Sequence, residues 1–425
     1  MTSSLEILPV THALNASVRV LGSKSLTNRA LLIAALASGE TRLTNALFSD
    51  DTYIFAQALQ TLGFDVQLDA PHTEMSITGL GGHIPAKRAR IFCGNAGTAA
   101  RFLSALLTLG EGEFILDGDP RMRARPIGDL VRSLTQLGAS LEISASNCPP
   151  IKISASRLLG GHTSIAGNIS SQFLSGLLMV SPYAQHSVDI EVITELTSKP
   201  YIDLTLSIMC DFGVEIERED YRHFVIHPAQ YQAQGSYSIE SDVSAASYFF
   251  AAPAVCGGTV RVENIDLRSK QGDIKFLDIL QQMGCIVTRS SDCIEVTRST
   301  DLLGVDADMR DISDTAQTLA AIAPFASTPT RIRGIATSRV KETDRVSATC
   351  TELTRLGVHV EEHSDGLTIY PCEVFQPATI QTYNDHRMAM AFSLIGLRIP
   401  GLVIEDPASV SKTFPNYFEV LGSLQ

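Results

Sequence analysis

A pair of elements that occurs six times along the 425-residue chain constrains its fold more than any other feature. In each copy an apolar run with helical spacing ends in a large hydrophobic residue and a glycine. The interval between glycines runs from 65 residues (357 to 422) to 75 residues (63 to 138). Glycine at this place indicates a helix end, because it adopts a left-handed backbone without a Cβ clash. The six predicted helix ends are Gly63, Gly138, Gly213, Gly284, Gly357 and Gly422.

A second shared element precedes each of these glycines. It is a polar cluster that opens a run rich in small apolar residues, which predicts a buried helix with a polar start. Self-similarity at a constant period is the sequence signature of a repeat architecture. The chain is therefore expected to contain six equivalent structural units. The six clusters begin at Ser25, Asn95, Ser170, Asp242, Asp314 and Asp385.

Short alternating segments follow each of the first five glycines and predict β-hairpins, as at 214–226 and 358–370. The sixth copy stops shortly after its glycine, so the alternating residues 5–20 are expected to complete the sixth unit. The chain then divides into two domains of three units each. Units one to three occupy 23–240, and units four to six occupy 241–425 plus 1–22.

The alternation of strands and helices places the chain in the α/β class, and its length suits two domains better than one core. We expect the helices to cover the sheets, with the more charged Gly-ended helices in the outer layer. No apolar run is long enough to span a membrane, and residues 1–10 lack signal-peptide character. Eight cysteines without CxxC spacing fit a reducing cytoplasm. His223 and His227 have no acidic company, so they do not predict a metal site.

Charge gives the first indication of a ligand. The chain is acidic, with 46 Asp and Glu against 33 Lys and Arg, which argues against a nucleic-acid surface. Its cations nevertheless gather near the starts of the repeated helices, where unpaired N–H groups already favour anions. This pattern predicts a small polyanion held between the two domains. The cations are Lys24, Arg29, Arg101, Arg121, Arg123, Arg125, Lys341, Arg345, Arg387 and Lys412.

Individual motifs leave alternatives open. GSKS at 22–25 lacks the GxxxxGK spacing of a phosphate loop, which disfavours a Walker-type ATPase. NAGT at 95–98 fits a ligand site and equally a plain helix cap. SSQ at 170–172 suits phosphate and hydroxyl recognition, although serines at a helix start are more often plain caps. KETDR at 341–345 places two cations four residues apart beside Glu342, and it also fits a surface ion pair. A carboxylate held among cations, such as Asp314, is suited to act as a base, and a lysine there as an acid.

Taken together, the motifs resemble those of the 5-enolpyruvylshikimate-3-phosphate synthase family from about residue 5 to 418. They are GSKSLTNRALLIAAL, GNAGTAARFL, MRARPIGDL, NISSQFLSGLL, TSKPYI, RVKETDR, NDHRMAM and VSKTFP. The resemblance implies two inside-out α/β domains, each of three repeated βαβαββ-type units. It implies transfer of the enolpyruvyl group of phosphoenolpyruvate to the 5-hydroxyl of shikimate 3-phosphate. It also implies no metal or organic cofactor and a monomer. The cysteines fit the cytoplasm, and the split of the cations between the two domains predicts that the domains close on a bound polyanion.

The resemblance also assigns site residues. For catalysis we expect Asp314 as the base toward the hydroxyl, Glu342 with Lys24 as proton donors, and His386 in support. The residues implied for shikimate 3-phosphate are Lys24, Ser25, Arg29, Ser170, Ser171, Gln172, Ser198, Tyr201, Asp314, Thr337 and Lys341. The residues implied for phosphoenolpyruvate are Lys24, Asn95, Gly97, Arg125, Gln172, Arg345, Arg387 and Lys412.

Two positions depart from the family pattern. Thr337 stands where the family has asparagine, and Phe102 stands where bacterial members often have proline. The sister enzyme UDP-N-acetylglucosamine enolpyruvyl transferase is the nearest alternative, but the loop 117–126 lacks the cysteine expected there. The first cluster also has KS in place of KN. A non-catalytic anion-binding repeat protein is a further alternative, and it predicts loss of the lysine and carboxylate positions, which this chain retains.

Overall fold

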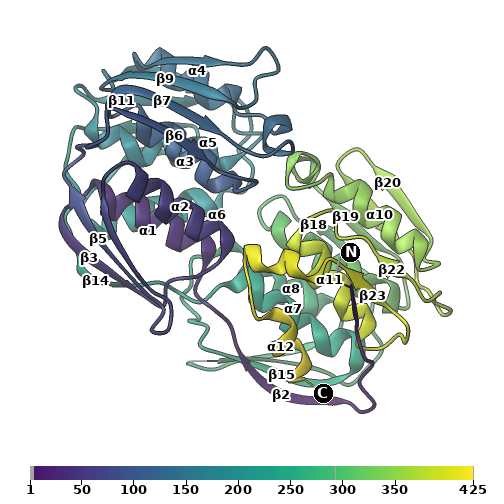
Figure 1. The fold of residues 1–425 in the computed structure, drawn as a ribbon. Helices are drawn as coiled ribbons and strands as arrows, with labels where there is room; N and C mark the ends of the chain where they lie inside the picture. Colours follow the sequence, from purple (N-terminus) through teal and green to yellow (C-terminus); the bar gives the residue numbers. More distant parts are fainter. Residues whose placement is uncertain (1–3, 292, 425) are drawn as a thin grey trace. The chain divides into compact units, whose positions relative to one another are not determined.

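The computed structural model describes residues 4–291 and 293–424. The chain forms two compact units (Figure 1). One unit comprises Gly22–Ile239, and the other combines the segment that ends at Leu21 with the chain from Glu240 onward. The chain passes from one unit to the other at 21/22 and at 239/240, one residue before the expected boundaries at 22/23 and 240/241. That each unit is a domain with independent motion stays a prediction.

Three four-stranded sheets and six α-helices build the Gly22–Ile239 unit. The sheet orders are β14-β3-β5-β4, β6-β7-β9-β8 and β10-β11-β13-β12. The helices are α1 (Lys24–Leu36), α2 (Asp50–Thr61), α3 (Gly97–Leu107), α4 (Gly128–Gln136), α5 (Ser171–Val180) and α6 (Pro200–Asp211), with the 3-10 helices η1 (Met122–Ala124) and η2 (Ser181–Tyr183). The strands are β3 (Ser38–Thr44), β4 (Asp65–Asp69), β5 (Glu74–Leu80), β6 (Arg88–Phe92), β7 (Glu111–Asp117), β8 (Ser140–Ile143), β9 (Ile151–Ser156), β10 (Gly161–Ile165), β11 (Val188–Val192), β12 (Glu217–Glu219), β13 (His223–Ile226) and β14 (Gly235–Ser238).

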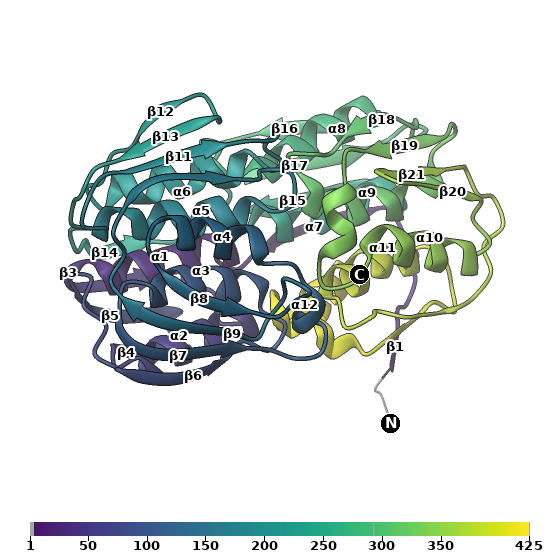
Figure 2. The ribbon, with the colours of Figure 1, turned by 90° about the horizontal axis from the view of Figure 1, so that it is seen from above.

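The helices of this unit lie inside and the sheets outside (Figures 1 and 2). Every residue of α3 is buried, and α3 packs directly against α5 and α1. Strands such as β9 alternate buried and exposed residues, so one face of each sheet covers the helices. The α/β class is therefore confirmed, but the expectation that helices cover the sheets was wrong. The helices that begin at the polar clusters are rich in small residues, which let them pack on each other, and the sheets form the outer layer.

The second unit has the same construction. Its sheet orders are β16-β17-β15-β2, β18-β19-β21-β20 and β1-β23-β22. The helices are α7 (Val243–Cys256), α8 (Phe276–Gln282), α9 (Ala316–Ile322), α10 (Arg345–Arg355), α11 (His386–Gly396) and α12 (Tyr417–Gly422), with η3 (Gly272–Lys275), η4 (Ser313–Thr315), η5 (Ala323–Phe325), η6 (Ala336–Val340) and η7 (Pro407–Lys412). The strands are β1 (Ser4–Glu6), β2 (Leu14–Arg19), β15 (Gly258–Glu263), β16 (Ile286–Arg289), β17 (Cys293–Arg298), β18 (Asp306–Asp308), β19 (Thr330–Arg333), β20 (Val360–His363), β21 (Gly366–Ile369), β22 (Thr379–Ile380) and β23 (Val403–Glu405).

The N-terminal strands only partly match the expectation that they complete the sixth unit. Strand β1 does so, since it pairs antiparallel with β23. Strand β2 instead pairs parallel with β15 and extends the sheet of the fourth unit. The alternation of residues 14–19 predicts a half-buried strand, but it carries no information about which sheet edge accepts that strand. The N-terminal segment thus ties two sheets of the same unit together.

The predicted helix ends are confirmed at five glycines. Their φ angles lie between 85° and 99°, the left-handed region that favours glycine, at Gly63, Gly138, Gly213, Gly284 and Gly357. Gly422 was predicted wrongly, because it is the last residue of α12 and does not follow it. Among the described residues, no helix combines the length and apolar character needed to cross a membrane.

Candidate active site

The helix starts of the second unit bring together a set of charged side chains that we call the Arg345 cluster. It comprises Asp314, Lys341, Glu342, Arg345, Asp385 and Arg387. Arg345 is at its centre: Nε lies 2.8 Å from Asp385 Oδ2, and Nη2 lies 2.8 Å from Glu342 Oε2. Its Nη1 lies 3.2 Å from Asp314 Oδ1. One buried guanidinium therefore bridges three carboxylates that are far apart in the sequence.

Local helix capping explains why these side chains meet. Asp344 precedes α10 and its carboxylate accepts a hydrogen bond from Ser347 N at 3.0 Å. Asp385 precedes α11 and accepts from Arg387 N at 2.9 Å. Both caps satisfy N–H groups that a helix start leaves without partners. Because α10 and α11 both pack against α9, their starts and η4 converge on the Arg345 cluster.

The electrostatics of the cluster keep Arg345 charged. Burial lowers the pKa of the Arg345 guanidinium, but the charges of its three carboxylate neighbours outweigh burial and raise its pKa above the ordinary value. Arg387 Nη2 lies 2.6 Å from Asp314 Oδ2, and Lys341 Nζ lies 3.9 Å from Asp314 Oδ1. Asp314 thus faces three cations while its side chain stays partly accessible. Such a carboxylate can accept a proton from a ligand that reaches it.

The other expected residues of this unit lie in or at the starts of further helical segments. His386 is the first residue of α11 and is fully buried, with Nδ1 3.6 Å from Asp385 Oδ1. Thr337 lies half-buried in η6, and Lys412 is the last residue of η7. Tyr248 on α7 faces Arg387, whose Nη1 lies 3.4 Å from the hydroxyl oxygen.

Arg29 is the most unusual cation of the Gly22–Ile239 unit. It is 2% exposed, and within the described residues its hydrogen bonds all go to neutral oxygens. They run from Nε to Thr205 Oγ1 at 2.8 Å, and from the terminal nitrogens to Ser25 O, Ser175 Oγ and Tyr201 O at 3.0, 3.2 and 3.3 Å. Burial lowers the pKa of Arg29 to about 10. A buried guanidinium whose partners are all neutral is stabilised further when an anion binds to it.

Two aromatic rings complete this environment. The Arg29 guanidinium lies 5.2 Å from the ring centroid of Phe102 and 5.8 Å from that of Tyr201. Rings at this distance attract a cation through their quadrupole. Phe102, one of the departures from the family pattern, is therefore a fully buried support for Arg29.

Arg125 meets the start of α3. Its Nη1 donates to Asn95 O and Asn95 Oδ1 at 3.0 and 2.9 Å. A Cβ added at Gly97 would lie only 2.4 Å from Arg125 Nη2, so a larger residue here would displace the guanidinium. Gln172 at the start of α5 donates to Thr98 Oγ1 at 3.2 Å, which joins α5 to α3. The structure thus brings Arg125 and Gln172 to the start of α3, although both lie far from it in the sequence.

The remaining expected residues of this unit also lie at helix starts. Lys24 begins α1, and its Nζ lies 3.2 Å from Asp51 Oδ2. Ser170 caps α5, where its Oγ accepts from Gln172 N at 3.3 Å, and Ser171 is the first helical residue. Ser198 precedes α6 with φ of 56°, which is strained for a residue other than glycine and is typical of functional sites.

Some of the cations that the sequence placed near helix starts have other partners. Arg101 donates to Gly97 O and Pro126 O at 3.2 and 3.0 Å. Arg123 forms an exposed ion pair with Asp117 at 2.6 Å. Among the residues that the structure describes, no group of three or more His, Cys, Asp or Glu side chains is arranged to hold a metal ion.

Three acidic residues were missed by sequence reasoning. Asp51 pairs with Lys24, Asp385 holds two nitrogens of Arg345, and Asp273 lies at the start of η3. Burial, together with the charge of Asp314, raises the pKa of Asp273 to about 7. The Ser244 hydroxyl donates to Asp273 Oδ2. Only Asp385 had a sequence signal, since it opens the sixth polar cluster.

Repeated α/β units with inward helices, and with buried arginines and carboxylates at the helix starts, are typical of enzymes that bind small anionic substrates. The sequence pattern of the family described as EPSP synthase (3-phosphoshikimate 1-carboxyvinyltransferase) matches residues 9–421. The chain belongs to this family.

Similar proteins agree with that assignment. A 3-phosphoshikimate 1-carboxyvinyltransferase of Nostoc sp. is 49% identical over 417 residues, covering 98% of each chain. One from Marinomonas sp. is 47% identical over 424 residues, covering 99% of each. The solved structure of an EPSP synthase from Acinetobacter baumannii is similar with a TM-score of 0.83 and 25% identity, covering 99% of this chain and 98% of that one.

Proposed function

We propose that the chain transfers the enolpyruvyl group of phosphoenolpyruvate to the 5-hydroxyl of shikimate 3-phosphate and releases phosphate. This is 3-phosphoshikimate 1-carboxyvinyl transfer, a step toward chorismate and the aromatic amino acids. The observation that carries the proposal is the Arg345 cluster, in which two carboxylates suited to proton transfer contact the same anion-binding arginine. The family match supplies the substrates.

The reaction has two stages, an addition and an elimination, and each of them moves protons. In the addition, the hydroxyl oxygen bonds to the central carbon of phosphoenolpyruvate, loses its proton, and the methylene carbon gains one. In the elimination, the new methyl group loses a proton and the carbon–oxygen bond to phosphate breaks. A base near the hydroxyl and an acid near the methylene carbon therefore both accelerate transfer.

Residues of both units divide this work in the proposal. Asp314 accepts the hydroxyl proton, and its carboxylate is held in place by contacts with Arg345, Arg387 and Lys341. Glu342 and Lys24 deliver the proton to the methylene carbon. His386, buried beside Asp385, supports the cluster.

The arginines and lysines of the candidate site suit the phosphate and carboxylate groups of the two substrates. Arg29 is assigned to shikimate 3-phosphate, because its guanidinium has only neutral hydrogen-bond partners within the described chain. Arginine forks fit carboxylate and phosphate oxygens with two parallel bonds. The residues assigned to shikimate 3-phosphate are Lys24, Ser25, Arg29, Ser170, Ser171, Gln172, Ser198, Tyr201, Asp314, Thr337 and Lys341. Those assigned to phosphoenolpyruvate are Lys24, Asn95, Gly97, Arg125, Gln172, Arg345, Arg387 and Lys412.

Both substrates are small molecules, and the proposal adds no nucleic acid, membrane or protein partner. It includes action as a monomer in the cytoplasm, with the units at 23–240 and at 241–425 plus 1–22 as the two domains. Sedimentation equilibrium of the full chain measures its mass directly. A dimer at micromolar concentration contradicts the monomer.

The test of the reaction is acceptor choice. Phosphate release is measured with phosphoenolpyruvate and either shikimate 3-phosphate or UDP-N-acetylglucosamine. We expect release with shikimate 3-phosphate alone. Equal or faster release with the UDP-sugar assigns the chain to the sister reaction, and no release with either supports a non-catalytic anion-binding protein.

A further inference from the structure

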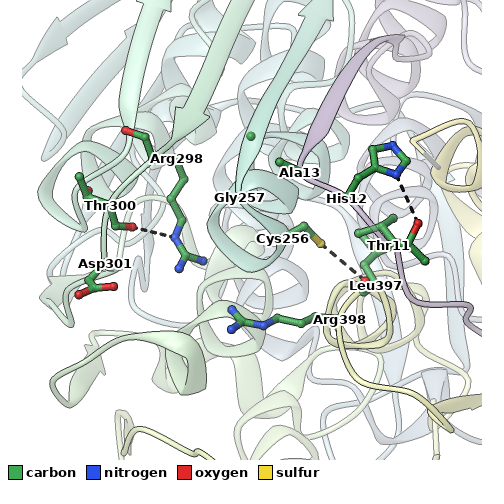
Figure 3. A pocket seen from close by; sticks show the side chains of 13 residues that line it. Thr11, His12, Ala13, Cys256, Gly257, Arg298, Thr300, Asp301, Leu397 and Arg398 are labelled. Atoms are coloured by element: carbon green, nitrogen blue, oxygen red, sulfur yellow. Dashed lines mark hydrogen bonds between the residues drawn. The ribbon is translucent and has the colours of Figure 1, made fainter.

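A pocket of about 850 Å³ lies in the second unit, away from the Arg345 cluster (Figure 3). Four segments line it: the loop before β2, the junction of α7 and β15, the end of β17 with the loop that follows, and the end of α11. Its volume is within the range of pockets that hold small organic ligands. Val10, Ala13, Cys256 and Leu397 give it apolar walls.

Two arginines project into this pocket from different segments. Arg298 Nη1 donates to Ala254 O at 2.5 Å, and its Nε donates to Thr300 O at 3.0 Å. Arg398 Nη1 donates to Val255 O at 3.1 Å. Figure 3 shows both guanidinium groups directed toward the same end of the pocket, with Asp301 beside Arg298. The backbone carbonyls therefore fix both cations before any ligand binds.

The charges of the pocket are not balanced. Asp301 is its one carboxylate among the lining residues, against the two guanidiniums of Arg298 and Arg398. Burial, followed by the charge of Arg398, lowers the pKa of the Arg298 guanidinium. Two like charges held close together at a partly desolvated place raise the free energy of the empty pocket. An anion between them removes that penalty.

We propose that this pocket binds a small organic anion, with its carboxylate or phosphate group between Arg298 and Arg398 and its apolar part against Val10, Ala13 and Leu397. The remaining N–H groups of the two guanidiniums donate to the anion. Burial raises the pKa of the Cys256 thiol to about 12, so this side chain offers apolar surface and not a nucleophile. The complex is non-covalent.

Helix capping alone does not account for the arrangement. The carbonyls of Ala254 and Val255 belong to the last turn of α7, where one cation suffices to complement the helix dipole. The structure places two arginines there, and Arg398 also stacks on Phe325 with 5.3 Å to the ring centroid. The second arginine adds charge that the helix end does not need.

The pocket is separate from the candidate active site. Asp242 caps the start of α7 and Asp385 caps the start of α11, whereas the pocket lies at the ends of both helices. The 14 residues of α7 span about 20 Å. The proposed ligand therefore binds without contacting any residue assigned to the substrates, and the proposal does not depend on the enzymatic assignment.

The experiment is calorimetric titration of the full chain with phenyl phosphate, benzoate and neutral benzamide. We expect the two anions to bind and benzamide not to bind. Arg398→Gln is expected to weaken phenyl phosphate binding about tenfold, the loss of one charge-assisted hydrogen bond. Arg268→Gln removes the same charge from an exposed arginine outside the pocket and serves as the matched control.

A second variant keeps the test independent of folding defects. Asp301→Asn removes the competing carboxylate and is expected to tighten phenyl phosphate binding about two- to fivefold. Hydrogen exchange with phenyl phosphate present is expected to slow in peptides covering 10–13 and 256–258. Equal affinity in wild type and Arg398→Gln, equal binding of benzamide, or protection confined to the starts of α10 and α11 overturns the proposal.

Discussion

Replacing Asp273 by asparagine is expected to make the second unit more stable than in the wild-type chain, by an amount that grows as pH rises. Asp273 is 3% exposed, and its Oδ1 has no hydrogen-bond partner among the described residues. Burial and the charge of Asp314 raise its pKa from 3.8 to about 7. A carboxyl group whose pKa is raised on folding contributes stability below its unfolded pKa, and this contribution is lost as pH rises through the folded value.

The magnitude follows from the two pKa values. Raising the pKa from 3.8 to about 7 is worth about 4 kcal/mol when the group is fully ionised in both states. Between pH 5 and pH 8 the wild-type chain should lose about 2 to 3 kcal/mol of this contribution. Asparagine cannot ionise, so the variant lacks this loss. Groups that do not interact with Asp273 titrate alike in both chains and cancel in the difference.

The assay is urea unfolding at pH 5, 6, 7 and 8, followed by hydrogen exchange of α7 peptides, which report on this unit alone. The free-energy difference, variant minus wild type, should become more positive by about 2 to 3 kcal/mol from pH 5 to pH 8. Asp278→Asn, at an exposed carboxylate of α8, should change stability by less than about 0.5 kcal/mol throughout. A pH-independent difference for Asp273→Asn refutes the reasoning.

Three further perturbations test the candidate active site. Glu342→Gln and Asp314→Asn keep side-chain shape but remove proton transfer, so each should lower kcat about 100- to 10,000-fold, far more than it weakens substrate binding. Near-normal kcat in either variant removes that residue from the acid–base set. Gly97→Ala places a Cβ 2.4 Å from Arg125 Nη2, so the displaced guanidinium should weaken phosphoenolpyruvate binding about tenfold or more by titration, and an unchanged Kd contradicts the assigned contact. Shikimate 3-phosphate should tighten the binding of a phosphoenolpyruvate mimic and the mimic should tighten shikimate 3-phosphate by the same factor, with a smaller radius of gyration in X-ray scattering; independent binding with an unchanged radius rejects domain closure.

Much of the fold could be predicted because local signals repeat. Hydrophobic spacing and helix-ending glycines such as Gly63 and Gly138 report on the chain within a few residues, and six copies reinforce one another. The partner of β2 could not be predicted, because strand pairing between separate units depends on which sheet edge is open. The inward position of the helices came from the family resemblance, whereas the general rule that helices cover sheets gave the opposite result.

The candidate site also contains residues that the sequence could predict and residues that it could not. Lys24, Arg345 and Arg387 could be found because they stand at helix starts, where position along the chain predicts position in space. The carboxylates that complete them are harder to find. Asp51 and Asp273 lie outside the repeated polar clusters, near the starts of the helices that end at Gly63 and Gly284, and only the packing of separate helices brings them to the cations. Burial, which sets the pKa of Asp273, is a property of the folded unit and not of its local sequence.

The most direct test of the proposed reaction is its product in heavy water. Phosphoenolpyruvate and shikimate 3-phosphate are incubated with the chain in D2O, and the product is analysed by mass spectrometry with phosphate measured in parallel. We predict one phosphate per enolpyruvyl ether, with deuterium in the methylene group, because the addition delivers a solvent proton to that carbon and the elimination removes one. Phosphate release without the enolpyruvyl ether, or an ether without deuterium, would contradict transfer by addition and elimination.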